Sequence, residues 1–537
     1  MNQPSQQRKH NAPPPLPGRP RPAGGLRIGE ARGRWTLLAT VLGSGMAMLD
    51  ATVVNIALPA LGRDLRVDVA GLQWTVNAYT LTLAAFILLG GSLGDRYGHR
   101  RVFVLGAAFF ALASLLCAVS PDATLLILAR ALQGIAGALL TPSSLAIIAA
   151  TFHPDDRGRA IGAWSGLGGV VAAVGPFLGG YLVESVGWRW IFLINLPIAL
   201  ATVAVALLRV PETSDPAAPS RPDVAGALLG ALGLAGVTYA LIAAAENGAS
   251  AGVWVSAAVG VAGLVAFLAT ERFSRSPMMP LGIFSSRQFS AANAVTFAVY
   301  AALGGIFFIL VLDLQVVAGF SPLAAGAALL PVTAVMLLGS PRSGALARRI
   351  GPRAPMTVGP LVSAGGVLLL LRVGPDASYT TEVLPAMGVF GLGLTITVAP
   401  LTAAVLAAVP THISGLASGV NNAVARTAGL MAVAVLPLAT GLSADDYRQQ
   451  AAFDAAFRVA VLLCAVVLAA GGLLSWALIR NPRAAEAGAR ADEAVEGAVA
   501  DGEATPGHGA PEDEERREKP RHRAFCSIDA TPLEPHR

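Results

Sequence analysis

Long apolar segments follow one another along most of the chain, and short polar loops separate them. Fourteen such segments fit between residues 35 and 479, each near the roughly 17–25 residues that a helix needs to cross a bilayer. The pattern predicts an all-α integral membrane protein. The number of helices is open by one at 322–371, where Pro and Gly interrupt the pattern. The predicted spans are 35–61, 72–93, 102–119, 123–150, 160–183, 190–208, 224–245, 253–270, 291–317, 322–339, 356–371, 383–409, 414–442 and 455–479.

The composition agrees with a chain that is surrounded by lipid. Of its 537 residues, 54% are hydrophobic and 13% are charged, against about 25% charged in an ordinary soluble domain. The net charge of +5 is compatible with nucleic-acid binding, but the arginines lie in short loops between apolar runs, as membrane topology requires. We therefore expect a lipid bilayer as partner and no nucleic acid.

The arginines of the loops predict the orientation. With the N-terminus inside, the short cytoplasmic loops carry many arginines and the outer loops few, in line with the positive-inside rule. We expect a multi-pass protein of the cell membrane with both termini in the cytoplasm. The inner arginines are Arg96, Arg100, Arg101, Arg157, Arg159, Arg209, Arg221, Arg272, Arg275, Arg287, Arg342, Arg348, Arg349 and Arg353; the outer ones are Arg63, Arg66, Arg189, Arg372 and Arg448.

A weak internal repeat predicts two six-helix bundles with two helices inserted between them. GSLGDRYGHR at 91–100, after the second span, is echoed by GALARRIGPR at 344–353, after the tenth. Matched loops are typical of transporters that are built from structural repeats. The predicted parts are a disordered cytoplasmic N-tail (1–34), an N-terminal bundle (35–208), a linker with inserted helices 7 and 8 (209–289), a C-terminal bundle (290–480) and a disordered cytoplasmic C-tail (481–537).

The sequence offers no pattern for a metal or a cofactor. Its three cysteines have no CxxC spacing, and none of its seven histidines lies inside an apolar run. A proton carrier within the membrane must then be a carboxylate. The sequence also contains no GxxxxGK[ST] loop for a nucleotide. We therefore expect no cofactor, no metal, and a process that the proton-motive force drives.

One acidic residue lies near the middle of the first span. Asp50 is about fifteen residues into this span, roughly 22 Å along a helix axis. An ionised carboxylate at that depth costs about 2.5–3.5 kcal/mol on insertion scales, and acids within membranes are functional by default. We therefore predict that Asp50 binds and releases a proton. The alternative is a structural role, in which a neighbouring helix satisfies the carboxylate.

Several motifs together resemble the major facilitator superfamily, and within it the fourteen-helix drug:proton antiporter branch. The chain is similar to the bacterial antibiotic-resistance and export proteins of that branch. In the N-terminal half the matching motifs are LDATVVNIALPAL (49–61), LQWTVNAYTL (72–81), GSLGDRYGHRR (91–101), LARALQGIAGA (128–138), GPFLGG (175–180) and WRWIFLINLPI (188–198); looser matches in the C-terminal half are SPLAAGAALLP (321–331) and SGLASGVNNAVARTAG (414–429).

The resemblance implies roles for single residues. Arg130, in the helix 4 motif, is implied in proton coupling with Asp50; the alternative is an arginine that reaches the outer interface. The loop 2–3 motif implies a gating loop that latches the inside-closed state, unless it is a topology signal only. The helix 5 motif implies an antiport hinge, although close helix packing also explains its glycines. The gating-loop residues are Gly91, Asp95, Arg96, Gly98 and Arg100; the hinge residues are Gly175, Pro176, Gly179 and Gly180.

Other residues are candidates for a substrate cavity, although packing between helices explains each one taken singly. Asp313 stands where the branch usually carries an aromatic or neutral residue, so it either meets a substrate or pairs with Arg426. Two more departures are Arg348, where the first half has Asp95, and Val171, where a glycine is expected. The cavity candidates are Asp313, Trp74, Asn77, Tyr79, Asn55, Asn195 and Arg426.

These observations predict a monomeric exporter, not an enzyme, which exchanges small, mostly apolar drugs or antibiotics for protons. One alternative is a nutrient importer or uniporter, because a fold does not fix the direction of transport; GPFLGG and Asp50 argue against it. The other is a polytopic membrane enzyme, which would need a loop with clustered acids or histidines.

Overall fold

The computed structural model describes residues 25–215, 222–274, 277–410, 413–442 and 449–481. Within these ranges, fourteen spans are long and apolar enough to cross a membrane, which confirms the predicted number. The helices are α1 (Ala31–Leu65), α2 (Val69–Tyr97), α3 (His99–Val119), α4 (Ala123–Thr151), α5 (Pro154–Ser185), α6 (Trp190–Leu193), α7 (Asn195–Arg209), α8 (Val224–Asn247), α9 (Ala251–Phe273), η1 (Leu281–Ser285), α10 (Arg287–Val316), α11 (Pro322–Ala327), α12 (Leu330–Ile350), α13 (Arg353–Leu369), η2 (Leu370–Arg372), η3 (Tyr379–Val383), α14 (Leu384–Ala407), α15 (Ser414–Thr440) and α16 (Gln450–Leu478).

Proline breaks two of the spans. One span consists of α6 and α7, and another of α11 and α12. A proline in a helix lacks an N–H, and its ring clashes with the carbonyl group four residues earlier. Leu193 and Ala327 lie four residues before Pro197 and Pro331, and each is the last residue of the first segment of its span. The second break accounts for the irregular pattern at 322–371, which contains two spans as predicted.

The loops lie on two opposite sides of the membrane domain, because consecutive spans run in opposite directions. Leu26, before α1, donates its N–H to the carbonyl of Thr151 at the end of α4, at 2.8 Å. Asn481, after α16, accepts the N–H of Arg353 at the start of α13, at 3.1 Å. We call the face with these contacts the arginine-rich side, because its loops carry the arginines that were predicted to be cytoplasmic. The opposite face is the arginine-poor side.

The repeated loop motif has the same geometry in both halves. Gly98, between α2 and α3, and Gly351, between α12 and α13, have φ values of 104° and 83°, in the region that favours glycine. In each half, the backbone N–H two residues after the glycine donates to a side chain that follows the sixth span of that half. The acceptor is Glu212 in the first half, at 3.0 Å, and Asn481 in the second, at 3.1 Å. This correspondence supports two six-span repeats that are separated by α8 and α9.

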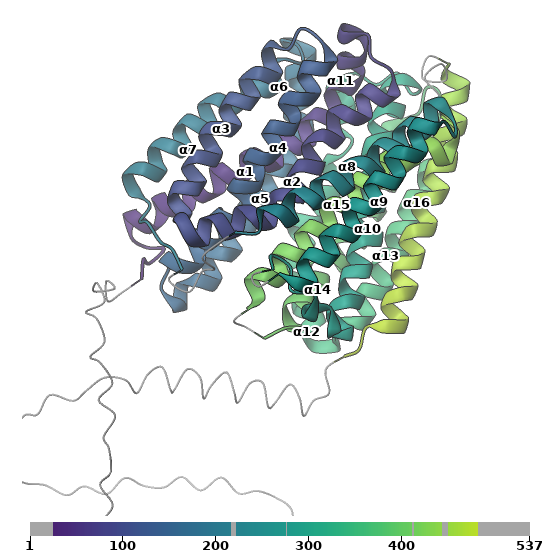
Figure 1. Ribbon diagram of the computed structural model, residues 1–537. Coiled ribbons are helices and arrows are strands. Elements are labelled where there is room, and N and C mark those ends of the chain that lie inside the picture. The colour runs from purple at the N-terminus through teal and green to yellow at the C-terminus, as the bar shows by residue number, and fades with distance from the viewer. Residues whose placement is uncertain (1–24, 216–221, 275–276, 411–412, 443–448, 482–537) are drawn as a thin grey trace, which may run out of the picture. The chain divides into compact units, whose positions relative to one another are not determined.

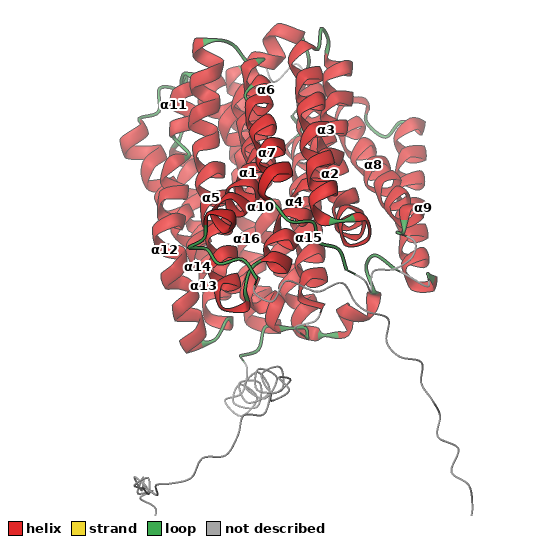
Figure 2. Ribbon diagram, turned by 90° about the vertical axis from the view of Figure 1, so that its left-hand side faces the viewer, coloured by secondary structure: helices red, strands yellow, loops and turns green. Residues whose placement is uncertain are grey.

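The two halves meet along two seams. At one seam α2 packs against α15, and α8 contacts both helices; the three lie side by side in Figure 1. At the other seam α5 packs against α11 and α12. Figure 2 shows the α8–α9 hairpin at one side of the helices and α5 and α12 at the other. The inserted hairpin therefore borders only one of the two seams.

An even number of spans places both ends of the membrane domain on one side. Reporter fusions at residue 30 and after Arg480 should both report the cytoplasm, because the arginine-rich loops share that side. Activity of a cytoplasmic reporter and of a periplasmic reporter at the two sites measures this. Opposite sides for the two fusions would contradict an even number of spans.

Candidate functional site

A buried ion pair joins α1 to α4. Asp50 Oδ2 and a guanidinium nitrogen of Arg130 form a salt bridge, and each residue is only 1% exposed. Asp50 lies about 22 Å along the axis from the end of α1, near the middle of the span. The structure thus brings together the two residues that were predicted for proton coupling. Arg130 does not reach the outer interface, because its guanidinium is buried against the acid.

Amide and hydroxyl groups complete the surroundings of Asp50. Its Oδ1 accepts hydrogen bonds from the amides of Gln133 at 2.8 Å and Asn195 at 3.2 Å. Both amides also donate to the hydroxyl of Ser114, at 2.9 and 3.3 Å. The amide oxygen of Gln133 accepts from Arg130 at 2.6 Å. A buried charge is tolerated when it is paired and hydrogen-bonded, and this arrangement meets that condition for an ionised Asp50.

The other faces of Arg130 are occupied as well. Its Nε donates to the carbonyl of Thr75 at 3.1 Å. Its guanidinium carbon lies 4.4 Å from the ring centre of Tyr79 and 5.9 Å from that of Phe192, within the range of cation–π attraction. A guanidinium cannot lose its charge. These contacts hold Arg130 from sides that Asp50 does not occupy, and proton exchange by the pair stays a prediction.

Sequence reasoning found this site only in part. Tyr79 and Asn195 were candidates for the substrate cavity and instead belong to the network of Asp50. Gln133 lies three residues after Arg130, on the same face of α4, and that spacing was a usable signal. The residues that were missed are Gln133, Ser114, Thr75 and Phe192.

Of the remaining cavity candidates in the N-terminal half, one packs against another helix and two have polar atoms without a partner. Trp74 packs against Tyr239 of α8, with 6.2 Å between the ring centres, so it belongs to the α2–α8 contact. Asn77 is buried, and neither polar atom of its amide has a partner among the described residues. The side-chain oxygen of Asn55 is also without a partner there. Substrate binding by Asn77 and Asn55 stays a prediction.

Asp313 lies inside the C-terminal half. It is 0% exposed, three residues before the end of α10. Neither carboxylate oxygen has a hydrogen-bond partner within the described ranges, and the charged groups that act on it are Asp454 and Arg458 of α16. Pairing with Arg426 is therefore not found among the described contacts. The influence of Asp313 on substrate choice stays a prediction.

Arg426 lies between the two halves. It is half-buried in α15, and its charge acts on Tyr79 of α2 and Tyr300 of α10. Among the described residues, no hydrogen bond or ion pair of its guanidinium is found. An arginine within a membrane span normally faces a water-filled cavity or a partner. This position supports the prediction that Arg426 belongs to the substrate cavity.

The halves are joined at the arginine-poor side. Gln315 of α10 donates its side-chain N–H to the carbonyl of Ile56 in α1, at 3.0 Å. Glu184 at the end of α5 accepts the backbone N–H of Leu323 at the start of α11, at 3.2 Å. Glu184 thus links the two halves. The structure therefore shows a state that is closed on the arginine-poor side.

The glycines of the predicted hinge allow close packing in this closed region. A Cβ atom on Gly179 would come within 3.0 Å of a Val53 side-chain carbon in α1, and one on Gly180 within 2.7 Å of the Leu323 Cα. Close packing thus explains these glycines, and a hinge function stays a prediction. Gly175 and Pro176 face Thr52 and Gly326 in the same region.

The gating loop binds the linker that follows α7. Arg100 and Arg101 form ion pairs with Glu212 at 3.5 and 3.6 Å, and Asp95 contacts His99 at 3.7 Å. A side chain at Gly98 would collide with Glu212, because a Cβ atom there would lie 2.5 Å from its carboxylate. These partners all belong to the N-terminal half and its linker. A latch across the halves is not formed by these contacts in this state and stays a prediction for the inside-closed state.

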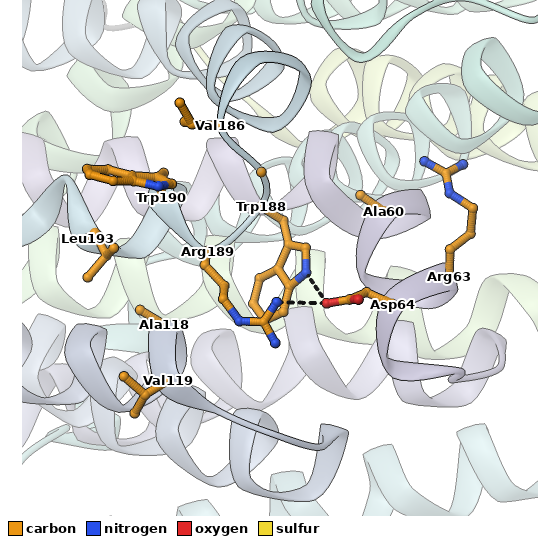
Figure 3. Close-up of a pocket in the computed structure, with 11 residues that line it drawn as sticks. Ala60, Arg63, Asp64, Ala118, Val119, Val186, Trp188, Arg189, Trp190 and Leu193 are labelled. Atoms are coloured by element: carbon orange, nitrogen blue, oxygen red, sulfur yellow. Dashed lines mark hydrogen bonds and ion pairs between the residues drawn. The ribbon is translucent and has the colours of Figure 1, made fainter.

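A separate pocket of about 690 Å³ lies where the loop between α5 and α6 meets the end of α1. Trp188 Nε1 and Arg189 each donate to Asp64 at 2.8 Å, and the Arg189 guanidinium lies 4.3 Å from the Trp188 ring centre. Figure 3 shows the three side chains converging in this pocket. The contacts tie α1 to the start of α6. None of the proton-coupling residues lines this pocket, so it is not the candidate site.

Known proteins resemble the chain both in sequence and in fold. The family model of the Major Facilitator Superfamily matches residues 40–433. A tetracenomycin C resistance and export protein of Streptomyces glaucescens is 36% identical over 77% of each chain. A puromycin resistance protein of Streptomyces alboniger is 36% identical over 84% of this chain and 92% of its own. A methylenomycin A resistance protein of Bacillus subtilis is 37% identical over 81% and 94%.

Solved structures show the same fold at low sequence identity. A bacterial homolog of the human lysosomal transporter Spinster, in an inward-facing and occupied conformation, has a TM-score of 0.60 and 14% identity. The inward-open xylose transporter XylE of E. coli has a TM-score of 0.58 and 14% identity. Each comparison covers 84% of this chain and 97% of the other.

The ion pair predicts non-additive effects on stability. Asp50→Asn or Arg130→Gln alone leaves one buried group without its partner, and each should lower the free energy of unfolding by up to about 3–5 kcal/mol. The double variant should lose clearly less than the sum, because no charge is then left unpaired. Denaturant unfolding of the purified variants in detergent measures this. Additive losses would show that the two side chains are energetically independent.

Proposed function

Because this chain belongs to the major facilitator superfamily, we propose that it is an efflux transporter for small, mostly apolar drugs or antibiotics and that protons drive it. The function of export is supported by relatives that are named for antibiotic resistance and export and that match most of the chain. The single observation that carries proton coupling is the buried pair of Asp50 and Arg130 in the middle of the N-terminal half. The protein acts without a cofactor, as a monomer in the cell membrane, with both termini in the cytoplasm.

The described state fits one step of an exchange cycle. The arginine-poor side is closed and Asp50 is held by Arg130, Gln133 and Asn195 in the way that suits its ionised form. We assign this state to the carrier that has released its proton toward the cytoplasm and awaits a substrate. A proton from outside then occupies Asp50 in the opposite state as the substrate leaves, and the two halves rock between the states.

The available driving force is sufficient for a useful gradient. One proton that enters across about 100 mV contributes about 2.3 kcal/mol, and one pH unit adds about 1.4 kcal/mol. One proton for one uncharged substrate therefore sustains a concentration ratio of several hundred. A monovalent cationic substrate draws on the pH gradient alone, because the exchange then moves no net charge.

Import of a nutrient on the same fold is the alternative function. A fold shows nothing about direction, and one structural neighbour is a sugar transporter. The relatives that are named for resistance and export favour the outward direction. Uptake and efflux assays in membrane vesicles of known orientation distinguish the two.

Asp50→Asn should abolish proton-driven efflux of every compound, because a coupling acid serves all substrates. Asp313→Asn is the matched control, since it removes another buried acid of a membrane span; it should keep coupling and weaken the efflux of cations more than that of neutral compounds. Efflux from proteoliposomes, with the pH gradient and the membrane potential imposed separately, measures both. Full coupled efflux by Asp50→Asn would remove this residue from the mechanism.

Asp95→Ala should insert normally and lose most of its efflux, because the inside-closed state loses a latch residue of the gating loop. Asp155→Ala, at an exposed acid of the same side, is the matched control and should transport like the parent protein. Membrane levels by immunoblot and efflux in cells measure the two effects. Unchanged efflux by Asp95→Ala would leave the loop with a topological role only.

A further inference from the structure

Two contacts show which faces of α2 and α15 meet in the seam between the halves. Near the arginine-poor end, Gln73 of α2 donates its side-chain N–H to the carbonyl of Val433 in α15. Nearer the arginine-rich end, Leu88 of α2 lies 3.0 Å from the position that a Cβ atom on Gly419 of α15 would take. The residues of α2 and α15 that lie between these contacts, on the same faces, therefore look toward the opposite helix.

Asn77 and Arg426 belong to these facing surfaces. Asn77 follows Gln73 by four residues, and residues four apart lie on one helix face. Arg426 is seven residues away from both Gly419 and Val433, which is about two helical turns, so it shares their face of α15. Arg426 lies twelve residues after the start of α15, about 18 Å along the axis. The two side chains are thus placed in the seam near the middle of the membrane.

Both side chains have hydrogen-bonding groups without a partner. Asn77 is 0% exposed, and neither polar atom of its amide has a partner among the described residues. Arg426 is half-buried, and within the described ranges its guanidinium makes no hydrogen bond or ion pair. Buried polar groups of native proteins are nearly always hydrogen-bonded. Two such groups on facing surfaces of one seam indicate a ligand that the protein can accept between its halves.

The two side chains together offer many donors and only one acceptor. A guanidinium has five N–H donors and no acceptor, and an amide group has two donors and one acceptor oxygen. The ligand group that suits them is rich in acceptors and poor in donors. A carboxylate fits best, because it can accept two parallel hydrogen bonds from a guanidinium; a phenolate oxygen has the same preference for donors.

The charge of Arg426 has no balancing acid among the described residues. Asp50, Arg130 and Arg426 are the charged groups that act on Tyr79, and the first two neutralise each other in their salt bridge. The charged group that acts on Tyr300 of α10 is Arg426 itself. A guanidinium keeps its charge, so the middle of the seam carries one uncompensated positive charge, which attracts an anion and repels a cation.

We propose that the seam between α2 and α15 binds the acidic group of the substrate, with Arg426 as its ion-pair partner and Asn77 as a further hydrogen-bond donor. The preferred substrates are then apolar organic anions with one carboxylate or phenolate. The proposal rests on the proposed function as an exporter, and it names the substrate class of that exporter. Exchange of a monoanion for one entering proton moves two charges, and about 100 mV contributes about fifty-fold in concentration ratio for each of them.

Three fluorescent probes that differ in one terminal group test the preference. They are pyrenes that carry a butyrate, a butanol or a butylammonium group. Their binding to the full-length protein in detergent at pH 7 is measured by energy transfer from tryptophan. The parent protein should bind the butyrate about tenfold more tightly than the butanol, and the ammonium most weakly, because the charge in the seam is positive. Equal affinities for the butyrate and the butanol would overturn the proposal.

Substitutions at the two positions assign the preference to these residues. Arg426→Gln should lower the affinity for the butyrate about tenfold and leave that for the butanol unchanged, whereas Arg426→Lys keeps the charge and should retain part of the preference. Asn77→Leu should weaken the butyrate several-fold. Arg372→Gln, at an exposed arginine of the arginine-poor side, is the matched control and should bind all three probes like the parent. Equal losses for the three probes in Arg426→Gln would overturn the proposal.

Thermal unfolding in detergent shows whether the protein itself neutralises Arg426. Arg426→Gln should unfold at the temperature of the parent or above it, since the substitution removes a charge that has no partner. A melting temperature several degrees lower would reveal a partner within the protein and would overturn the proposal. Failure of the proposed function would be seen differently, as parent proteoliposomes that export no pyrenebutyrate under a pH gradient while the binding preference persists.

Discussion

The buried ion pair of Asp50 and Arg130 is stable only if the N-terminal half supplies hydrogen-bonding partners for both charged groups. Two charges that leave water each lose several kcal/mol of solvation, and their attraction offsets this only when the remaining hydrogen-bonding groups are also satisfied. The amides of Gln133 and Asn195, the carbonyl of Thr75 and two aromatic rings supply these partners. They come from α2, α4, α6 and α7, so the site exists only when these helices are packed around α1. The stability of the bundle and the chemistry of the site therefore depend on the same contacts.

Asp50, the predicted proton site, and contacts that close the arginine-poor side lie on one helix. Asp50 is followed in α1 by Val53, which packs against Gly179 of α5, and by Ile56, whose carbonyl accepts from Gln315 of α10. Six residues of a helix span only about 9 Å. A shift of α1 that follows a change of charge at Asp50 thus acts directly on the contacts between the halves. Coupling between two sites requires a shared element that both can bias, and α1 is such an element.

The number of spans and the buried acid were predicted from local features of the sequence, whereas the partnership of Arg130 with Asp50 was implied by the resemblance of the helix 4 motif. A run of apolar residues has only one way to satisfy its backbone in lipid, and an acid at mid-membrane demands a partner. The surroundings of the pair were less accessible, because Ser114 and Phe192 come from other spans and carry no signal of their own. Asp313 shows another limit: its departure from the family pattern suggested a substrate contact or pairing with Arg426, and the charged groups that act on it in the structure are Asp454 and Arg458 of α16. Which face of an apolar helix is inward cannot be decided when nearly all its residues are apolar.

Repetition alone would give the molecule two equivalent seams. The glycine turns at Gly98 and Gly351, with their matched acceptors, show that the two halves keep a common plan. The inserted helices break this equivalence, because α8 packs on α2 and α15, and in the described part of the chain no corresponding helix packs beside α5 and α12. In α8 and α9 the glycines Gly236 and Gly260 approach so closely that a Cβ atom on one would lie 2.6 Å from the Cα of the other, which makes the hairpin one tightly packed unit. The inserted hairpin thus distinguishes the two seams of an otherwise repeated plan.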